Sequence, residues 1–195
     1  MLSSRLLNTL SRTEAVEANR VALSNRSKLT GREVFFNEND VIVSKTDPKG
    51  LITYANETFL DVSGFTEEQL IGAPHSILRH PDMPRAVFKF LWDTIVTGEE
   101  VFAYVLNRAK NGDHYWVFAH VTTSYDKSGQ IIGYHSNRRV PERKAVSAIA
   151  PIYKTLLDVE KAAANPKQGL DDSFKALVDF VTGTGLSYSE LVFTL

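Results

Sequence analysis

The sequence predicts an α+β fold in which five antiparallel strands form one sheet with helices on one of its faces. Two pairs of strand-like segments are each joined by a short turn, Asp-Pro-Lys-Gly at 47–50 and Lys-Asn-Gly-Asp at 110–113. Short helical signals and one longer helical pattern, at about 83–97, lie between the two pairs. Paired strands with helices between them are typical of an antiparallel sheet covered on one side.

The strands are placed by their apolar residues and by the turns that bound them. Segments 40–43 and 51–54 form the first predicted hairpin. Segments 100–108 and 114–124 form the second, because Asn-Gly is the strongest short hairpin signal. A turn at 126–129 leads to a fifth strand at 130–135. One face of 114–124 is uniformly apolar and is predicted to face inward: Tyr115, Val117, Ala119 and Val121.

The helices between the hairpins carry recognisable start and stop signals. Thr66 and Gln69 have capping-box spacing for a short helix that ends near Gly72. The longer helix at 83–97 is predicted to stop at Gly98. Its apolar residues share one stripe, as expected for a helix packed on a sheet: Phe88, Leu91, Trp92 and Ile95.

The flanking segments differ from this core, so the chain divides into three zones. Residues 1–34 are predicted to be a polar helical segment with a capping box at Ser11, residues 35–140 the core of strands and short helices, and residues 141–195 a helical segment. In the last zone Asp171 is expected to cap a helix that stops at Gly183, and the apolar tail is expected to be docked.

The C-terminal zone also contains an amphipathic stripe, which we call the C-terminal stripe: Val146, Ile149, Ile152 and Leu156. Such a face either folds back onto the sheet or meets another chain. Since symmetric dimers are the commonest closed assembly, a homodimer is expected.

Composition excludes several classes of function. The chain has 195 residues, 43% of them hydrophobic, and a formal net charge of -1, which lacks the basic footprint of a nucleic-acid binder. It contains no cysteine, so disulfides and thiolate chemistry are impossible. It has no run of eighteen apolar residues and no signal-peptide pattern, so no membrane span and a cytoplasmic location are expected.

The run Arg-His-Pro-Asp at 79–82 is the strongest candidate site. Asp82 has the character of a helix N-cap, and that role needs no ligand. A cationic pair, Arg79 and His80, beside a helix N-terminus also suits the binding of a diphosphate or another anion. Both interpretations stay open on the sequence.

Two further residues have an open role. Asn107 lies at the end of an apolar strand face, where a buried amide needs hydrogen-bond partners from a ligand or from the backbone. Trp92 lies on the apolar helix stripe, where it either fills the core or borders a cofactor.

Catalysis and metal binding have little support. The five histidines have no metal-binding spacing, and without cysteine no haem can be attached covalently, so neither a metal site nor haem is expected. The chain also has no nucleophile motif, phosphate-cradling loop or paired-acid signature. We therefore do not expect an enzyme.

Short motifs narrow the fold further. In order they are Asn-Glu-Thr-Phe at 56–59, Ser-Gly-Phe-Thr at 63–66, Arg-His-Pro-Asp-Met-Pro at 79–84, Asn-Arg at 107–108 and Asn-Gly-Asp-His-Tyr-Trp at 111–116. With the element order they resemble the FAD-binding PAS sensor of the aerotaxis transducer family.

The resemblance implies a PAS fold that holds FAD between sheet and helices, with the redox state of the flavin read as a signal of oxygen or energy. It implies Arg79, His80, Asp82, Trp92 and Asn107 as cofactor-binding residues. The family continues into a membrane anchor and a coiled-coil signalling region, and neither is expected in this chain. The signal is therefore expected to pass to a partner such as a chemoreceptor or kinase.

One departure from the family pattern supports a rival hypothesis. The family commonly has a tryptophan soon after the Gly-Glu that ends the long helix, and Val101 stands at that place here. The rival is a PAS protein–protein interaction module without a cofactor, whose cleft is filled by its own side chains. Arg79, His80 and Asn107 favour the FAD sensor.

Overall fold

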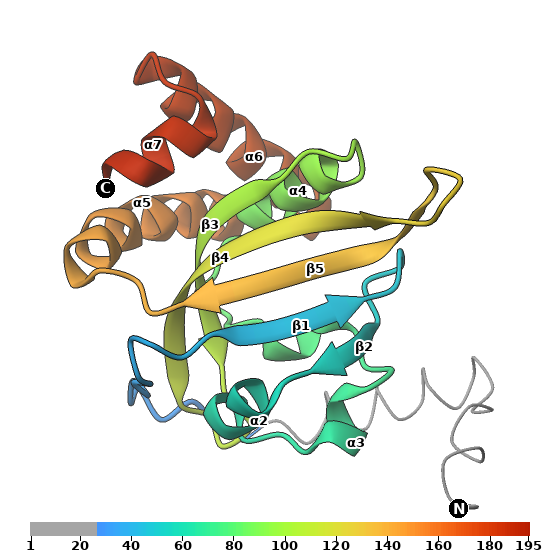
Figure 1. The fold of residues 1–195 in the computed structure, drawn as a ribbon. Coiled ribbons are helices and arrows are strands. Elements are labelled where there is room, and N and C mark those ends of the chain that lie inside the picture. Colours follow the sequence, from blue (N-terminus) through green and yellow to red (C-terminus); the bar gives the residue numbers. More distant parts are fainter. Residues whose placement is uncertain (1–26) are drawn as a thin grey trace, which may run out of the picture.

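A computed structural model describes residues 27–195 and confirms the predicted fold class (Figure 1). Five antiparallel strands form one sheet in the order β2-β1-β5-β4-β3. The strands are β1 (Ile42–Thr46), β2 (Ile52–Ala55), β3 (Val101–Arg108), β4 (His114–Tyr125) and β5 (Ile131–Arg139). The capping box predicted at Ser11 lies outside the described residues. Residues 27–34, the described part of the segment predicted to be helical, contain no helix, so the prediction was wrong there.

The two hairpins form as predicted, although two strands have different bounds. β5 extends to Arg139 instead of ending at 135, and β1 covers Ile42–Thr46 instead of 40–43. Both changes have one cause, because β1 and β5 pair with each other over the full length of β1, from Ile42 opposite Arg138 to Thr46 opposite Tyr134. Because of this pairing, polar residues become part of β1 and β5, which the local sequence pattern does not predict.

Helices α2 (Glu57–Ser63), α3 (Glu67–Leu70), η1 (His75–Leu78) and α4 (Arg85–Ile95) connect β2 to β3. Asn56 caps α2 by accepting the N–H of Phe59 at 3.1 Å, and it also accepts the N–H of Val43 at 2.9 Å. One side chain therefore fixes α2 to β1. The backbone N–H of Thr66 donates to Gln69 at 3.2 Å, which confirms the reciprocal half of the predicted capping box.

The inward phase of β4 is confirmed. Tyr115, Val117, Ala119 and Val121 are buried. Trp116 lies on the opposite face, where its ring stacks on Tyr153 with the centroids 6.2 Å apart.

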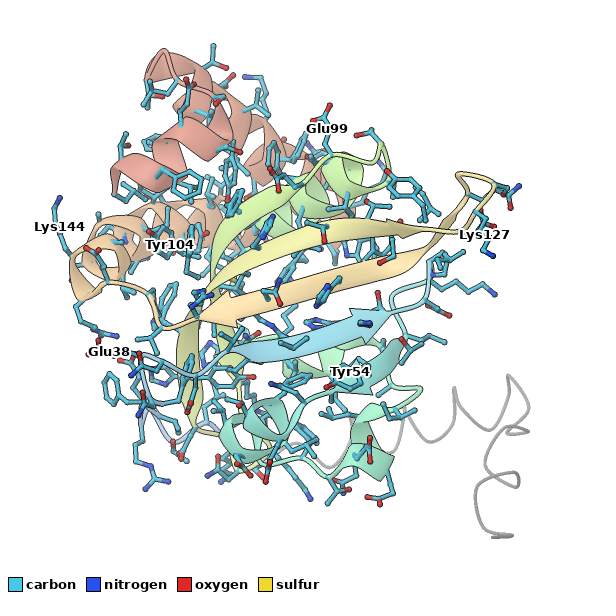
Figure 2. All side chains as sticks on the ribbon, viewed as in Figure 1. Glu38, Tyr54, Glu99, Tyr104, Lys127 and Lys144 are labelled. Carbon is cyan, nitrogen blue, oxygen red and sulfur yellow. The ribbon has the colours of Figure 1, made fainter. Side chains whose placement is uncertain are left out.

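The C-terminal helices lie beside β3 and cover part of the outer face of the sheet (Figure 1). They are α5 (Arg143–Ala162), α6 (Pro166–Gly183) and α7 (Tyr188–Thr194). The hydroxyl of Tyr153 donates to the carbonyl of Tyr104 at 2.7 Å, and Figure 2 shows Tyr104 where the sheet meets these helices. The apolar tail is docked as predicted, because Leu191 and Val192 of α7 are buried.

The C-terminal stripe folds back within the chain. Val146, Ile149 and Leu156 are 5%, 4% and 2% exposed, and Ile152 is half-buried. Pro151 lies inside α5, which is a single helix of 20 residues. Of the two alternatives for this stripe, the intramolecular one is therefore observed. A homodimer stays a prediction and would need another surface.

The predicted start of the last long helix was wrong. α6 begins at Pro166, and the side chain of Asn165 accepts the N–H of Gln168 at 2.9 Å. Asp171 lies inside the helix and pairs with Lys167 at 2.9 Å instead of capping it. Asn-Pro is itself a strong helix start, with an amide acceptor followed by a proline at the first helical position.

The cap of α4 comes from a different part of the chain than predicted. Asp82 makes no cap bond, because α4 begins at Arg85 after Pro84. Glu160 of α5 instead accepts the N–H of Ala86 at 3.1 Å and the Nε of Arg85 at 3.0 Å. The side chain of Glu160 is only 7% exposed, so this contact joins α4 to the C-terminal helices away from solvent.

Glu160→Gln is expected to lower the free energy of unfolding by about 1–2 kcal/mol, because the cap loses its charge and the pairing with Arg85 weakens. Urea unfolding of both proteins measures this effect. Asp158→Asn is the matched control, since Asp158 pairs only with Lys154 and its side chain is 59% exposed. Equal losses in the two variants would contradict the capping role.

Residues 27–34 form a segment, which we call the strap, that runs along the turn between β3 and β4. Thr30 donates its N–H to the carbonyl of Gly112 at 3.0 Å, and Val34 donates to the carbonyl of His114 at 2.7 Å. Asp113 accepts the Thr30 hydroxyl at 2.5 Å and pairs with Arg32. The Asn-Gly-Asp-His part of the motif at 111–116 therefore holds the strap as well as forming a turn.

Asp113 should make stability depend on pH. Its bond from Arg32, together with bonds from Thr30 and Asn111, lowers its pKa from about 3.8 to about 2. Because the pKa of the folded state is the lower one, this stabilisation is complete above the unfolded value and is lost as the pH falls from near 3.8 towards 2. Urea midpoints measured across this range should fall less steeply in Asp113→Asn, and parallel curves would contradict the assignment.

Candidate functional site

A cavity of about 480 Å³ lies between the inner face of the sheet and helix α4. All four residues of the predicted stripe on this helix border it: Phe88, Leu91, Trp92 and Ile95. The sheet contributes small and apolar side chains, among them Val105, Ala119 and Val121. Leu170 of α6 also borders the cavity, so the C-terminal helices complete its wall.

Three of the five predicted site residues border this cavity. They are Arg79, Trp92 and Asn107. His80 and Asp82 are not part of its wall. The structure thus brings together residues from the loop after η1, from α4 and from β3, and it places the other half of the Arg-His-Pro-Asp run elsewhere.

Asn107 is the polar group whose environment is most informative. Asn107 is 3% exposed, and its Nδ2 is buried with no hydrogen-bond partner in the part of the chain that the structure describes. A buried amide donor without a partner is costly, so such a group usually marks a position where another molecule supplies the acceptor. Asn107 also forms an isolated bridge with Arg79, which brings the two residues to one part of the wall.

Arg79 is half-buried, and its guanidinium lies over the ring of Phe88 at 5.3 Å from the centroid. Four more cationic side chains border the cavity: Lys49, Arg85, Lys89 and Arg138. Arg85 is held by Glu160, and Lys89 by Asp93 at 2.6 Å. The wall near α4 is therefore rich in cations, as expected of a site for an anionic group.

His80 and Asp82 form a local turn. His80 is 6% exposed, and its Nδ1 accepts the backbone N–H of Asp82 at 3.1 Å. Its ring meets the edge of His114 with centroids 5.7 Å apart, and burial lowers the pKa of His80. The side chain of Asp82 is 62% exposed. In this geometry His80 orders the loop that carries Arg79. Contact of His80 or Asp82 with a cofactor stays a prediction.

Trp92 is both a packing residue and part of the cavity wall. Its ring meets Tyr134 of β5 edge-on with centroids 5.4 Å apart. Gly50 in the turn between β1 and β2 lies against the same ring, and a Cβ on Gly50 would lie 2.9 Å from it. The indole is thus fixed from two sides, and its position is well suited to bordering a flat ligand.

Sequence reasoning missed three polar side chains that β5, β1 and η1 bring to the cavity. Arg138, Ser44 and His75 all border it. Arg138 is 2% exposed and donates to the hydroxyl of Ser44. The only available signal was the alternation of β5, which places Arg138 on the same face as Ser136 and Tyr134, but the strand was predicted to end before it.

Comparisons with known proteins agree with this architecture. Residues 52–138 match the family model described as PAS fold. The aerotaxis receptor of Escherichia coli (strain K12) is 40% identical over 134 residues, which are 69% of this chain and 26% of the receptor. The nitrogen fixation regulatory protein of Klebsiella pneumoniae is 27% identical over 99 residues, which are 51% of this chain and 20% of that protein.

A solved structure from work on a flavin analogue and the light-oxygen-voltage domain mechanism has a TM-score of 0.51 to this chain at 19% identity. The match covers 59% of this chain and 86% of that chain. At this level of identity the likeness supports the fold alone.

The sheet order, the helices between β2 and β3 and the family match define the class: the chain contains a domain with the PAS fold, matched over residues 52–138. One of its relatives is the aerotaxis receptor, of which the chain spans about a quarter (26%). Within residues 27–195 no helix has the length and apolar character needed to cross a membrane.

Proposed function

We propose that this chain is a cytoplasmic PAS sensor that binds FAD in the cavity beside α4 and reports redox state, and through it oxygen or energy supply, to a chemoreceptor or kinase. The similarity to the aerotaxis receptor and the shared motifs support the choice of signal. The buried amide donor of Asn107, which borders the cavity and has no partner, is the observation that carries the proposal.

The residues present fit this cofactor. The cavity volume of about 480 Å³ lies within the usual range for small-molecule sites. The indole of Trp92 provides a flat wall on the helix side of the cavity. The small side chains of Ala119 and Val121 on the sheet leave room for a planar ring system between helix and sheet. Arg79 and Arg85 on the wall would hold the diphosphate.

FAD would supply reversible electron transfer, and the protein would supply the surroundings that turn this into a signal. Asn107 would fix the orientation of the ring by donating to its polar edge. Leu170 of α6 borders the same cavity, and Glu160 of α5 caps α4, so a change at the cavity wall bears directly on the C-terminal helices. These helices are the proposed route to the partner protein.

The rival function is a PAS interaction module without a cofactor. Val101, in the place of the family tryptophan, favours it: Val101 is 2% exposed and is not part of the cavity wall. A cleft filled by its own side chains, as the rival requires, would not retain a cavity of about 480 Å³. The absorption spectrum of the purified protein separates the two, because an oxidised flavin absorbs in the blue and the module would be colourless.

Asn107→Leu is expected to weaken FAD binding by up to about tenfold, which is the worth of one hydrogen bond between neutral groups. The same variant should not lose stability without FAD, because it removes an unsatisfied buried donor. Quenching of flavin fluorescence measures the dissociation constant. Asn137→Leu is the matched control, since Asn137 lies on the same sheet but in the strand phase opposite to Ser136 and Arg138. Equal FAD affinity in wild type and Asn107→Leu would contradict the proposed contact.

A further inference from the structure

Arg138 of β5 is a buried cation that no carboxylate neutralises. Its side chain borders the cavity and is 2% exposed. Among the ion pairs within residues 27–195, none includes Arg138. One of its terminal nitrogens donates to Ser44, whereas Nε and Nη1 are buried with no partner. Three of its five N–H groups thus have no acceptor within residues 27–195.

The other contacts of Arg138 compensate its charge only in part. The guanidinium lies 4.5 Å from the centroid of the Phe59 ring, which is a cation–π contact. Burial lowers the pKa of Arg138 to about 10, so the group stays charged at neutral pH.

The titratable neighbours of Arg138 are neutral. Enclosure beside the cavity, and then the charge of Arg138, lower the pKa of His75 to about 3, so its ring carries no charge at neutral pH. Burial raises the pKa of Tyr115, whose hydroxyl is also buried without a partner. The inner wall of the cavity therefore has a net positive charge, and two nitrogens of Arg138, Nε and Nη1, have no acceptor among the described residues.

An unpaired buried charge is expensive, and a well-packed apolar side chain of similar length would cost less. We propose that Arg138 binds the electron-rich edge of the ligand ring, with its free N–H groups donating to the oxygen and nitrogen acceptors of that edge. This inference rests on the proposed flavin site. It adds a separation of roles, in which Arg138 recognises the ring and Arg79 the diphosphate.

The charge of Arg138 would also raise the midpoint potential of a bound flavin. Uptake of two electrons and one proton leaves the flavin ring with one negative charge, which a buried guanidinium stabilises more than the neutral oxidised ring. A tenfold preference of Arg138 for the reduced form would raise the two-electron midpoint potential by about 30 mV.

The test compares Arg138→Met with wild type, using FAD and riboflavin, which has the same ring without the diphosphate. Arg138→Met is expected to weaken binding of both ligands by about ten- to a hundredfold, the worth of a charge-assisted hydrogen bond. The flavin-free variant is expected to melt at a higher temperature than flavin-free wild type, because a buried unpaired charge has been removed. In a titration with dithionite, the remaining bound flavin should have a lower midpoint potential.

Several outcomes would overturn the inference. A flavin-free variant that is less stable, with unchanged affinity, would make Arg138 a structural residue. A loss confined to FAD would move the contact from the ring to the diphosphate. Arg139→Met is the control, because Arg139 is exposed on the neighbouring position, and it should change none of these quantities.

Two further comparisons keep the test decisive. If Arg138→Met does not fold, Arg138→Lys keeps the charge but loses the planar fork, and it should bind both flavins several-fold more weakly; unchanged binding would overturn the inference. If wild type binds neither flavin, the proposed function itself has failed. If wild type binds the flavins and Arg138→Met and Arg138→Lys bind them equally well, only the inference has failed.

Discussion

Gly112→Ala is expected to detach the strap from the β3–β4 turn and to lower the free energy of unfolding by about 2–5 kcal/mol. Gly112 has φ +95°, in the region that residues with a Cβ rarely adopt, and this strain alone costs about 1–2 kcal/mol. A Cβ at this position would also overlap the carbonyl oxygen of Lys28. Because that atom belongs to the backbone of the strap, the strap itself would have to move.

The control for this prediction is Gly129→Ala. Gly129 occupies a similar conformation, with φ +82°, in the turn between β4 and β5, where a Cβ would meet nothing within 4 Å. It should show the backbone strain without the collision. The difference between the two urea midpoints therefore measures the strap contact, and proteolysis near Lys28 should increase only in Gly112→Ala. Equal destabilisation by the two changes would show that the strap adds nothing.

This pair of glycines also shows what the sequence could and could not predict about the fold. The Asn-Gly and Ser-Gly dipeptides identify the turns between β3 and β4 and between β4 and β5, because the backbone preference of glycine is local. Nothing local reveals that the strap, some eighty residues earlier in the chain, packs on one of them. The cap of α4 is a similar case, since Glu160 lies far along the chain from Ala86 and Asp82 is the nearer acidic residue.

The same distinction applies to the candidate site: residues that belong to local patterns could be predicted, and a residue placed by a long-range contact could not. Arg79, Trp92 and Asn107 belong to motifs and stripes that can be seen in the sequence, and all three border the cavity. Arg138 was missed because its place in β5 depends on pairing with Ile42 of β1, a long-range contact. Its missing partners are a property of the folded surroundings, which no periodicity encodes.

Arg79→Ala is expected to weaken FAD binding by roughly ten- to a hundredfold, which corresponds to about 1.5–3 kcal/mol for a hydrogen bond to a charged group. Riboflavin binding should change little, because riboflavin has no diphosphate for the guanidinium to hold. Fluorescence titrations with both ligands measure the two constants.

His80→Ala separates loop order from ligand contact. His80 is buried outside the cavity wall and accepts the N–H of Asp82, so its loss should lower the melting temperature of the protein even without flavin. Arg79 is half-buried on the wall, so its loss should alter flavin-free stability far less than FAD affinity. Equal effects of Arg79→Ala on FAD and riboflavin would assign Arg79 to the ring or to the loop, and the division of roles between Arg79 and Arg138 would then be wrong.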